Sequence, residues 1–160
     1  HIHWWQELNP VTTEALIQLT LGAPQLLYNG GLLLAPLRYF DAAKERPGLP
    51  PDVGALVETV AGDRIVLHLV NLSAVHARQV LLQAGTLGEH KFTQVEYNKI
   101  VSGYPGKVGD YGLPEVETAL ETVPVDGLHV QVELPPGTEI RLVIGLERHV
   151  HAASYRLPWQ

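Results

Sequence analysis

Apolar residues occupy every second position in two segments of the chain, residues 64–70 and 129–134. These positions are Ile65, Leu67, Leu69, Val130, Val132 and Leu134. Side chains two residues apart on a strand point to the same face of a sheet, so this spacing predicts strands with one buried face.

A strong turn signal, Pro135-Pro136-Gly137-Thr138, follows the second of these segments. Ile140, Leu142 and Ile144 continue the alternation beyond it, which predicts a hairpin. Similar patterns predict further strands at residues 55–60, 76–83, 90–97, 115–123 and 150–157. Seven or eight short strands separated by turns indicate a mainly β protein, an antiparallel β-sandwich formed by residues 51–160.

The first fifty residues have a different character. Residues 13–21 (TEALIQLTL) predict a short helix with Ala15, Leu16, Leu19 and Ala23 near one face and Gly22 as its stop. Residues 24–40 predict two extended pieces around a turn at residues 29–31. Residues 42–52 contain three prolines and four charged side chains, which is typical of a linker.

The apolar stretch from Leu26 to Leu37 needs a surface to cover it. The sequence also begins at His1 and contains no methionine. We therefore expect residues 1–50 to be the end of a larger unit, with an upstream catalytic domain or another subunit as the partner of this region.

Composition excludes several classes of function. The 160 residues contain no cysteine, so disulfides, thiolate metal clusters and thiol nucleophiles are absent. The net charge of -6 and the lack of a basic cluster argue against a nucleic-acid partner. No apolar run approaches the length of a membrane span, so we expect a soluble protein, cytoplasmic or secreted, without a membrane partner.

No catalytic set stands out. The serines are not in a nucleophile elbow, and the glycines match no phosphate-binding loop. The aspartates occur in polar or turn-like stretches, where turn formation or a solvated charge explains them; they are Asp41, Asp52, Asp63, Asp110 and Asp126.

Eight histidines leave two options for a divalent metal. On a strand, Glu147, His149 and His151 would share one face and offer carboxylate and imidazole ligands; the alternative is a solvated strand face. If His1 were a mature N-terminus, its amine and ring with His3 could hold copper, an arrangement similar to that of lytic polysaccharide monooxygenases.

Binding residues are easier to nominate. Residues 98–114 predict a long loop with rigid aromatic side chains beside polar ones, a combination suited to a sugar. The alternative is that these aromatic side chains, and the tryptophans near the start, pack as core. The candidate ligand-binding residues are Trp4, Trp5, Tyr104, Lys107, Asp110 and Tyr111.

Two segments carry a family resemblance. Residues 15–30 (ALIQLTLGAPQLLYNG) resemble the helix, G-x-P turn and last strand that close the barrel of α-amylase-like glycoside hydrolases. Residues 63–73 (DRIVLHLVNLS) are similar to a strand and turn of the C-terminal β-domain in such enzymes, including bacterial ones. The family has a further barrel helix between these segments, and here only the Pro-rich stretch lies there.

The resemblance implies a C-terminal, non-catalytic β-sandwich part of a carbohydrate-active enzyme, which stabilises the catalytic domain and contacts glycan. The catalytic acids would then precede Trp4, and none is expected in this chain. Two alternatives stay open: a stand-alone binding or structural subunit of a multi-chain assembly, and a histidine-ligated metal protein.

Overall fold

The computed structural model describes residues 17, 19–22, 35–101 and 117–160. Within these residues the chain forms nine strands in two antiparallel sheets, which confirms the mainly β, sandwich-like fold. The strands are β1 (Leu37–Asp41), β2 (Arg46–Pro47), β3 (Val53–Val60), β4 (Arg64–Asn71), β5 (Arg78–Ala84), β6 (Lys91–Ile100), β7 (Thr118–Gly127), β8 (His129–Leu134) and β9 (Glu139–Glu147).

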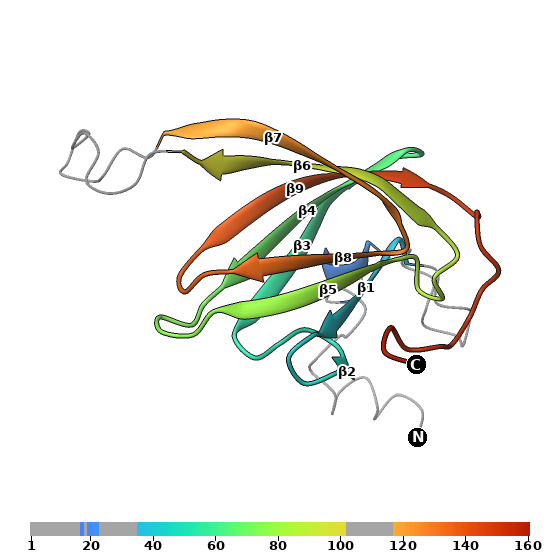
Figure 1. Cartoon of the computed structure of the whole chain (residues 1–160), viewed down its shortest axis with the longest axis horizontal. Coiled ribbons are helices and arrows are strands. Elements are labelled where there is room, and N and C mark those ends of the chain that lie inside the picture. Colours follow the sequence, from blue (N-terminus) through green and yellow to red (C-terminus); the bar gives the residue numbers. More distant parts are fainter. Residues whose placement is uncertain (1–16, 18, 23–34, 102–116) are drawn as a thin grey trace, which may run out of the picture.

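One sheet has four strands in the order β2-β1-β5-β8, and the other has five in the order β3-β4-β9-β6-β7 (Figure 1). The core lies between them. The alternating residues of β4 are fully buried there, as their spacing predicts: Ile65, Leu67 and Leu69. Leu134 of β8 and Leu142 and Ile144 of β9 are buried in the same cluster.

The predicted hairpin across Pro135–Thr138 is wrong. β8 pairs with β5 in the four-stranded sheet, whereas β9 pairs with β4 and β6 in the five-stranded sheet. The turn therefore carries the chain from one layer to the other. Two strands whose apolar faces meet across the core show the same alternation as two strands paired edge to edge, so the pattern alone could not separate these arrangements.

Asn71 fixes this crossing turn. Its side-chain Nδ2 lies 2.8 Å from the carbonyl oxygen of His76 and 3.1 and 3.0 Å from those of Leu134 and Pro135. Its Oδ1 accepts a hydrogen bond from the backbone N–H of Ser73, and Asn71 is only 1% exposed. Asn71 is thus a buried structural residue of this turn, and its amide nitrogen is inaccessible to a glycosylating enzyme in the folded protein.

The strand predicted at residues 150–157 does not form. The chain leaves β9 at Glu147, and His149 has a positive φ of 56°. The C-terminal segment, residues 148–160, then runs back towards β1 and β2 (Figure 1). It is held by isolated contacts, including hydrogen bonds from the backbone N–H of Ser154 to the Leu87 carbonyl and from that of His151 to the Glu89 carbonyl. The residues of 150–156 are exposed, so no apolar face required a sheet position.

The four-stranded sheet extends to the N-terminal side of the expected boundary at residue 51, because β1 and β2 belong to it. β1 pairs along its whole length with β5. The stretch expected to be a linker contains β2 and the turns on either side of it. The expected turn between two extended pieces at residues 24–40 lies mostly outside the described residues, apart from β1 and the residues just before it.

The described part of the expected helix, residues 17 and 19–21, is helical and ends at Gly22, as predicted. Gly22 has a φ of 63°, and a Cβ there would lie 2.9 Å from Val60 Cγ2 and 3.1 Å from Val57 Cγ1. The hydroxyl of Tyr39 donates a hydrogen bond to the Thr20 carbonyl oxygen. The helix end therefore packs on both β3 and β1. None of the described helical residues forms a helix long and apolar enough to cross a membrane.

Candidate functional site

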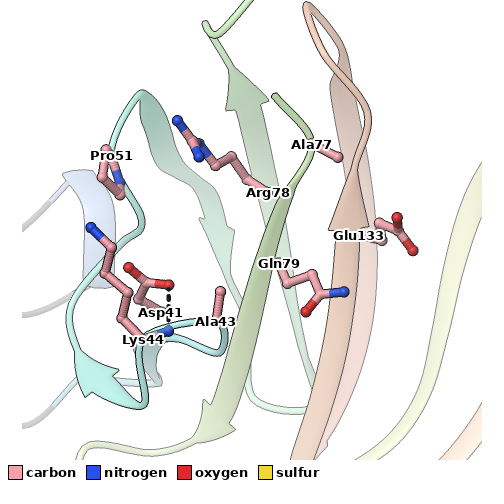
Figure 2. Close-up of a pocket in the computed structure, with 8 residues that line it drawn as sticks. All are labelled: Asp41, Ala43, Lys44, Pro51, Ala77, Arg78, Gln79 and Glu133. Atoms are coloured by element: carbon pink, nitrogen blue, oxygen red, sulfur yellow. Dashed lines mark hydrogen bonds between the residues drawn. The ribbon is translucent and has the colours of Figure 1, made fainter. Parts of the chain in front are cut away.

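A polar cleft of about 310 Å³ lies between the β1–β2 turn and the start of β5 (Figure 2). The β1–β2 turn and the loop before β3 form one wall, and the first residues of β5 with the neighbouring strand β8 form the other. The lining residues are Asp41, Ala43, Lys44, Pro51, Ala77, Arg78, Gln79 and Glu133. We call it the Asp41–Arg78 cleft.

Asp41 is the buried acid of this cleft. It is the last residue of β1, paired with Val80 of β5, and it is only 2% exposed. Its Oδ1 accepts a hydrogen bond of 3.3 Å from the backbone N–H of Lys44, which closes the turn. Its Oδ2 forms an ion pair of 3.3 Å with an Arg46 guanidinium nitrogen but no hydrogen bond of good geometry with any described residue. The guanidinium of Arg46 thus balances the charge of this buried carboxylate.

Arg78 supplies the opposite group. It begins β5, and its terminal guanidinium nitrogen donates to Asp52 Oδ2 at 2.9 Å. This ion pair orients the guanidinium, since Asp52 is held in a left-handed turn with a φ of 63°. The Nε–H of Arg78 is buried and has no hydrogen-bond partner in the part of the chain that the structure describes. Asp41 Oδ2 and Arg78 Nε are thus buried behind the wall of the cleft, and the polar groups that the cleft exposes belong to Lys44, Gln79 and Glu133.

A second polar cluster lies on the five-stranded sheet. His68 of β4 stands between two carboxylates, with Nε2 2.7 Å from Glu58 Oε2 and Nδ1 2.9 Å from Glu139 Oε1. Arg141 of β9 also contacts Glu58, with its Nε 2.9 Å from Oε2. A β-bulge between Val57 and Thr59 leaves Glu58 as the extra residue of β3, which re-aims its side chain.

The contacts of this cluster shift the pKa values of its members. Hydrogen bonds to Glu139 and Glu58 raise the pKa of His68 above its usual 6.5. Hydrogen bonds from Arg141 and His68 lower the pKa of Glu58 to about 2. Both ring nitrogens of His68 are already used by carboxylates, so the arrangement suits an imidazolium ion in a charge network rather than a metal ligand.

The proposed ligand-binding set lies outside the described residues. This applies to Trp4, Trp5, Tyr104, Lys107, Asp110 and Tyr111, and also to His1 and His3. Their roles stay predictions.

The proposed metal set is described, but its members point to different partners. Glu147 ends β9 and forms an ion pair of 3.0 Å with Lys91. His149 stacks edge-on against His90, with ring centroids 4.8 Å apart, and donates its backbone N–H to His90 Nδ1. His151 is exposed. The strand on which the three would share a face has already ended, and no group of three potential ligands in the described parts of the chain is arranged to hold a metal ion.

We compared the chain with protein-family models, curated proteins and solved structures. No match was found in any of the three comparisons. The resemblance to α-amylase-like enzymes therefore rests on the sequence segments alone.

The residues of the cleft were not apparent from the sequence. The sequence predicts a turn former or a solvated charge at Asp41, and the structure supports only the turn former, because the carboxylate is buried. Asp41 directly follows Tyr39 and Phe40, with a basic residue, Arg46, five positions later, but the same local sequence would also suit a solvated aspartate. Arg78 carried no such signal, since its partner Asp52 is 26 residues away.

Proposed function

We propose that this chain is the C-terminal, non-catalytic β-sandwich part of a carbohydrate-active enzyme of the α-amylase-like kind. In this role the sandwich stabilises the catalytic domain that precedes it and contacts glycan. The chemistry of glycoside cleavage belongs to acidic residues outside this chain.

The attachment of the helix end to the sandwich carries this proposal. Residues 15–30 resemble the end of a catalytic barrel, and the described part of that segment is packed tightly on the sandwich. Gly22 fits between Val57 and Val60 of β3 only because it has no side chain, and Thr20 is bonded to the buried Tyr39 of β1. A barrel continued from such a segment would be held rigidly against the sandwich, as a stabilising domain requires.

The second resembling segment supports the proposal through its position. Residues 63–73 cover β4 and the turn that follows it, which in this fold form the centre of the core and the joint between the layers. The resemblance thus falls on residues that define the sandwich.

The Asp41–Arg78 cleft supports the role in glycan contact. The exposed polar side chains that line it are those of Lys44, Gln79 and Glu133, which are suited to hydroxyl groups. Small-molecule pockets span roughly 300–1,000 Å³. At about 310 Å³ the cleft is therefore of a size for a single ring and not for an extended chain held along its length.

The test compares residues 1–160 with the complete natural protein that contains them. Both are purified and assayed for the release of reducing ends from soluble starch. We expect hydrolysis by the complete protein and none by residues 1–160.

Two results would overturn the proposal. Hydrolysis by residues 1–160 would show that the chain is itself catalytic. A complete protein that cleaves no α-glucan, or one whose activity appears only when a separate chain is added, would point instead to a binding or structural subunit.

A further inference from the structure

The C-terminal segment is tied by its own backbone N–H groups to the turn between β5 and β6, residues 85–90. The N–H of Ser154 donates to the Leu87 carbonyl oxygen at 2.8 Å, and that of His151 donates to the Glu89 carbonyl oxygen at 3.3 Å. Both acceptors are amide carbonyls, which do not titrate near neutral pH. These two hydrogen bonds are therefore insensitive to pH in themselves.

A third hydrogen bond differs from these two, because its acceptor is an imidazole. The backbone N–H of His149 donates to Nδ1 of His90 at 3.1 Å. A backbone N–H can only donate, so Nδ1 must present its lone pair, and the proton of the neutral ring lies on Nε2. Nδ1 is thus occupied and not free to bind a metal ion. A proton on Nδ1 would place two donors face to face and break the bond to His149.

The surroundings of His90 favour the neutral ring. His90 is only 7% exposed, and this burial lowers the pKa of the ring below its usual 6.5. Glu89 acts in the opposite direction, but its Oε1 lies 3.8 Å from Nε2, which is too far for a hydrogen bond. Arg148 and the His149 ring, which meets the His90 ring edge-on with centroids 4.8 Å apart, oppose a positive charge. The ammonium of Lys91, the next residue, is paired with carboxylates of β7 and β9.

The backbone of His149 is also held in an unfavourable conformation. Its φ of 56° lies in the left-handed region, which is costly for a residue with a Cβ. The hydrogen bond to His90 helps to hold this conformation, so loss of the bond leaves the cost uncompensated. Protonation of His90 therefore favours a different backbone conformation at the start of the C-terminal segment.

We propose that His90 is an acid-sensitive latch for the C-terminal segment. At neutral pH the ring is uncharged and Nδ1 holds the His149 N–H, and in mild acid a proton on Nδ1 breaks this bond and releases residues 149–154 from the turn. This inference does not rest on the proposed function, and either can fail without the other.

The direction of the pH dependence follows from linkage. Release exposes the His90 ring and returns its pKa to the usual 6.5, whereas docking of the segment lowers that pKa. The released state therefore binds the proton more tightly than the docked state. Docking is strongest above pH 6.5 and weakens as the pH falls from 6.5 through the pKa of the docked ring.

The test follows amide hydrogen exchange in residues 1–160 by NMR. Protection factors, which correct for the intrinsic pH dependence of exchange, are compared between neutral and mildly acidic buffer. We expect those of the His149 and Ser154 amides to fall at least about fivefold from about pH 7.5 to about pH 5. The amide of Leu72, which is hydrogen-bonded to a carbonyl oxygen elsewhere in the sandwich, is the internal control and should keep its protection.

The decisive variant is His90→Asn. The amide oxygen of the new side chain replaces Nδ1 as an acceptor for the His149 N–H but takes up no proton in this pH range. We expect the segment to be equally protected at both pH values in this variant. His76→Gln changes an exposed histidine and is the matched control, which should keep the pH dependence of the original chain.

Two results would overturn the latch: segment protection that does not change with pH, or a fall of the same size in His90→Asn. If His90→Asn does not fold or does not dock the segment, the imidazole NMR signals of the original chain decide the question. The latch requires the His90 ring to titrate below the usual 6.5, with the same midpoint as the loss of segment protection. A midpoint at or above 6.5, or one that differs from the loss of protection, would contradict it.

Discussion

The imidazole of His68 lies 2.7 Å from the carboxylate of Glu58, and its other ring nitrogen lies 2.9 Å from Glu139. Because a charged imidazole donates at both nitrogens, both contacts favour the protonated ring. Three neighbouring strands, β3, β4 and β9, are thereby joined on one face of the sheet by side chains as well as by their backbones.

This network makes stability depend on pH. The pKa of His68 is raised in the folded chain, so its stabilising contribution is fully present below the unfolded pKa of 6.5 and is lost as the pH rises through the folded pKa. We expect His68→Gln to lower the free energy of unfolding more at about pH 6 than at about pH 9. Urea denaturation at the two pH values measures this difference. His76→Gln, at an exposed histidine, is the control, and an equal loss at both pH values would contradict the account.

The joint at Asn71 should be the most sensitive polar position of the core. Asn71→Ala leaves the buried carbonyl oxygen of Leu134 without this donor and frees the turn between β8 and β9. We expect a loss of at least about 2 kcal/mol of unfolding free energy. Asn98→Ala, at an exposed position of β6, should change stability by less than about 0.5 kcal/mol. Similar losses in the two variants would show that the joint is unimportant.

Alanine substitutions at Gly85 and Gly137 distinguish the cost of a left-handed backbone conformation from the cost of a steric clash with the new Cβ. Both have a positive φ, of 85° and 61°. A Cβ at Gly85 would lie 2.5 Å from the carboxyl carbon of Glu89, whereas one at Gly137 would meet nothing within 4 Å. We expect Gly137→Ala to cost about 1 kcal/mol from its backbone alone and Gly85→Ala to cost clearly more. Thermal unfolding of the two variants tests this order, and the reverse order would refute it.

The C-terminal segment should contribute stability through Trp159. Its ring meets the fully buried Phe40 edge-on, with centroids 5.5 Å apart. Such a contact contributes about 0.5–1.5 kcal/mol beyond the area it buries, so Trp159→Ala should measurably lower the denaturation midpoint. Tyr155→Ala is the matched control, because Tyr155 is 81% exposed. A midpoint unchanged in both variants would mean that the segment does not hold the sheet.

Many strands of the sandwich could be predicted because buried apolar side chains alternate along them. The buried residues of β4, Ile65, Leu67 and Leu69, alternate with other side chains, and this pattern fixes both the strand and its inward face. The pairing of strands could not be predicted in the same way. The pairing depends on the turn at residues 135–138, which carries the chain from one sheet to the other. Asn71 holds this turn by a hydrogen bond to the carbonyl oxygen of Pro135, 64 residues later in the sequence.

The candidate site was harder to predict for a related reason. The cleft is made by Asp41 and Arg78, which lie on paired strands but far apart in the sequence, and an aspartate at the end of a strand gives the same local signal whether it is buried or solvated. The strand predicted at residues 150–157 does not form, because an alternation of apolar and polar side chains stabilises a strand only where the apolar side chains are buried. The exposed Tyr155 illustrates this, since it faces no core.

The central claim is that the sandwich stabilises a catalytic body through the helix end packed on β3. The most direct measurement is the temperature at which the complete protein loses starch-hydrolysing activity, compared between the natural sequence and Gly22→Ala. A Cβ at Gly22 would lie 2.9 Å from Val60 Cγ2 in a backbone of φ 63°, so this variant strains the attachment, whereas Gly62→Ala meets nothing within 4 Å and serves as the control. We expect an unchanged initial rate and a lower inactivation temperature for Gly22→Ala alone. An inactivation temperature equal to that of the natural protein, with residues 1–160 clearly destabilised by the same substitution, would contradict the claim.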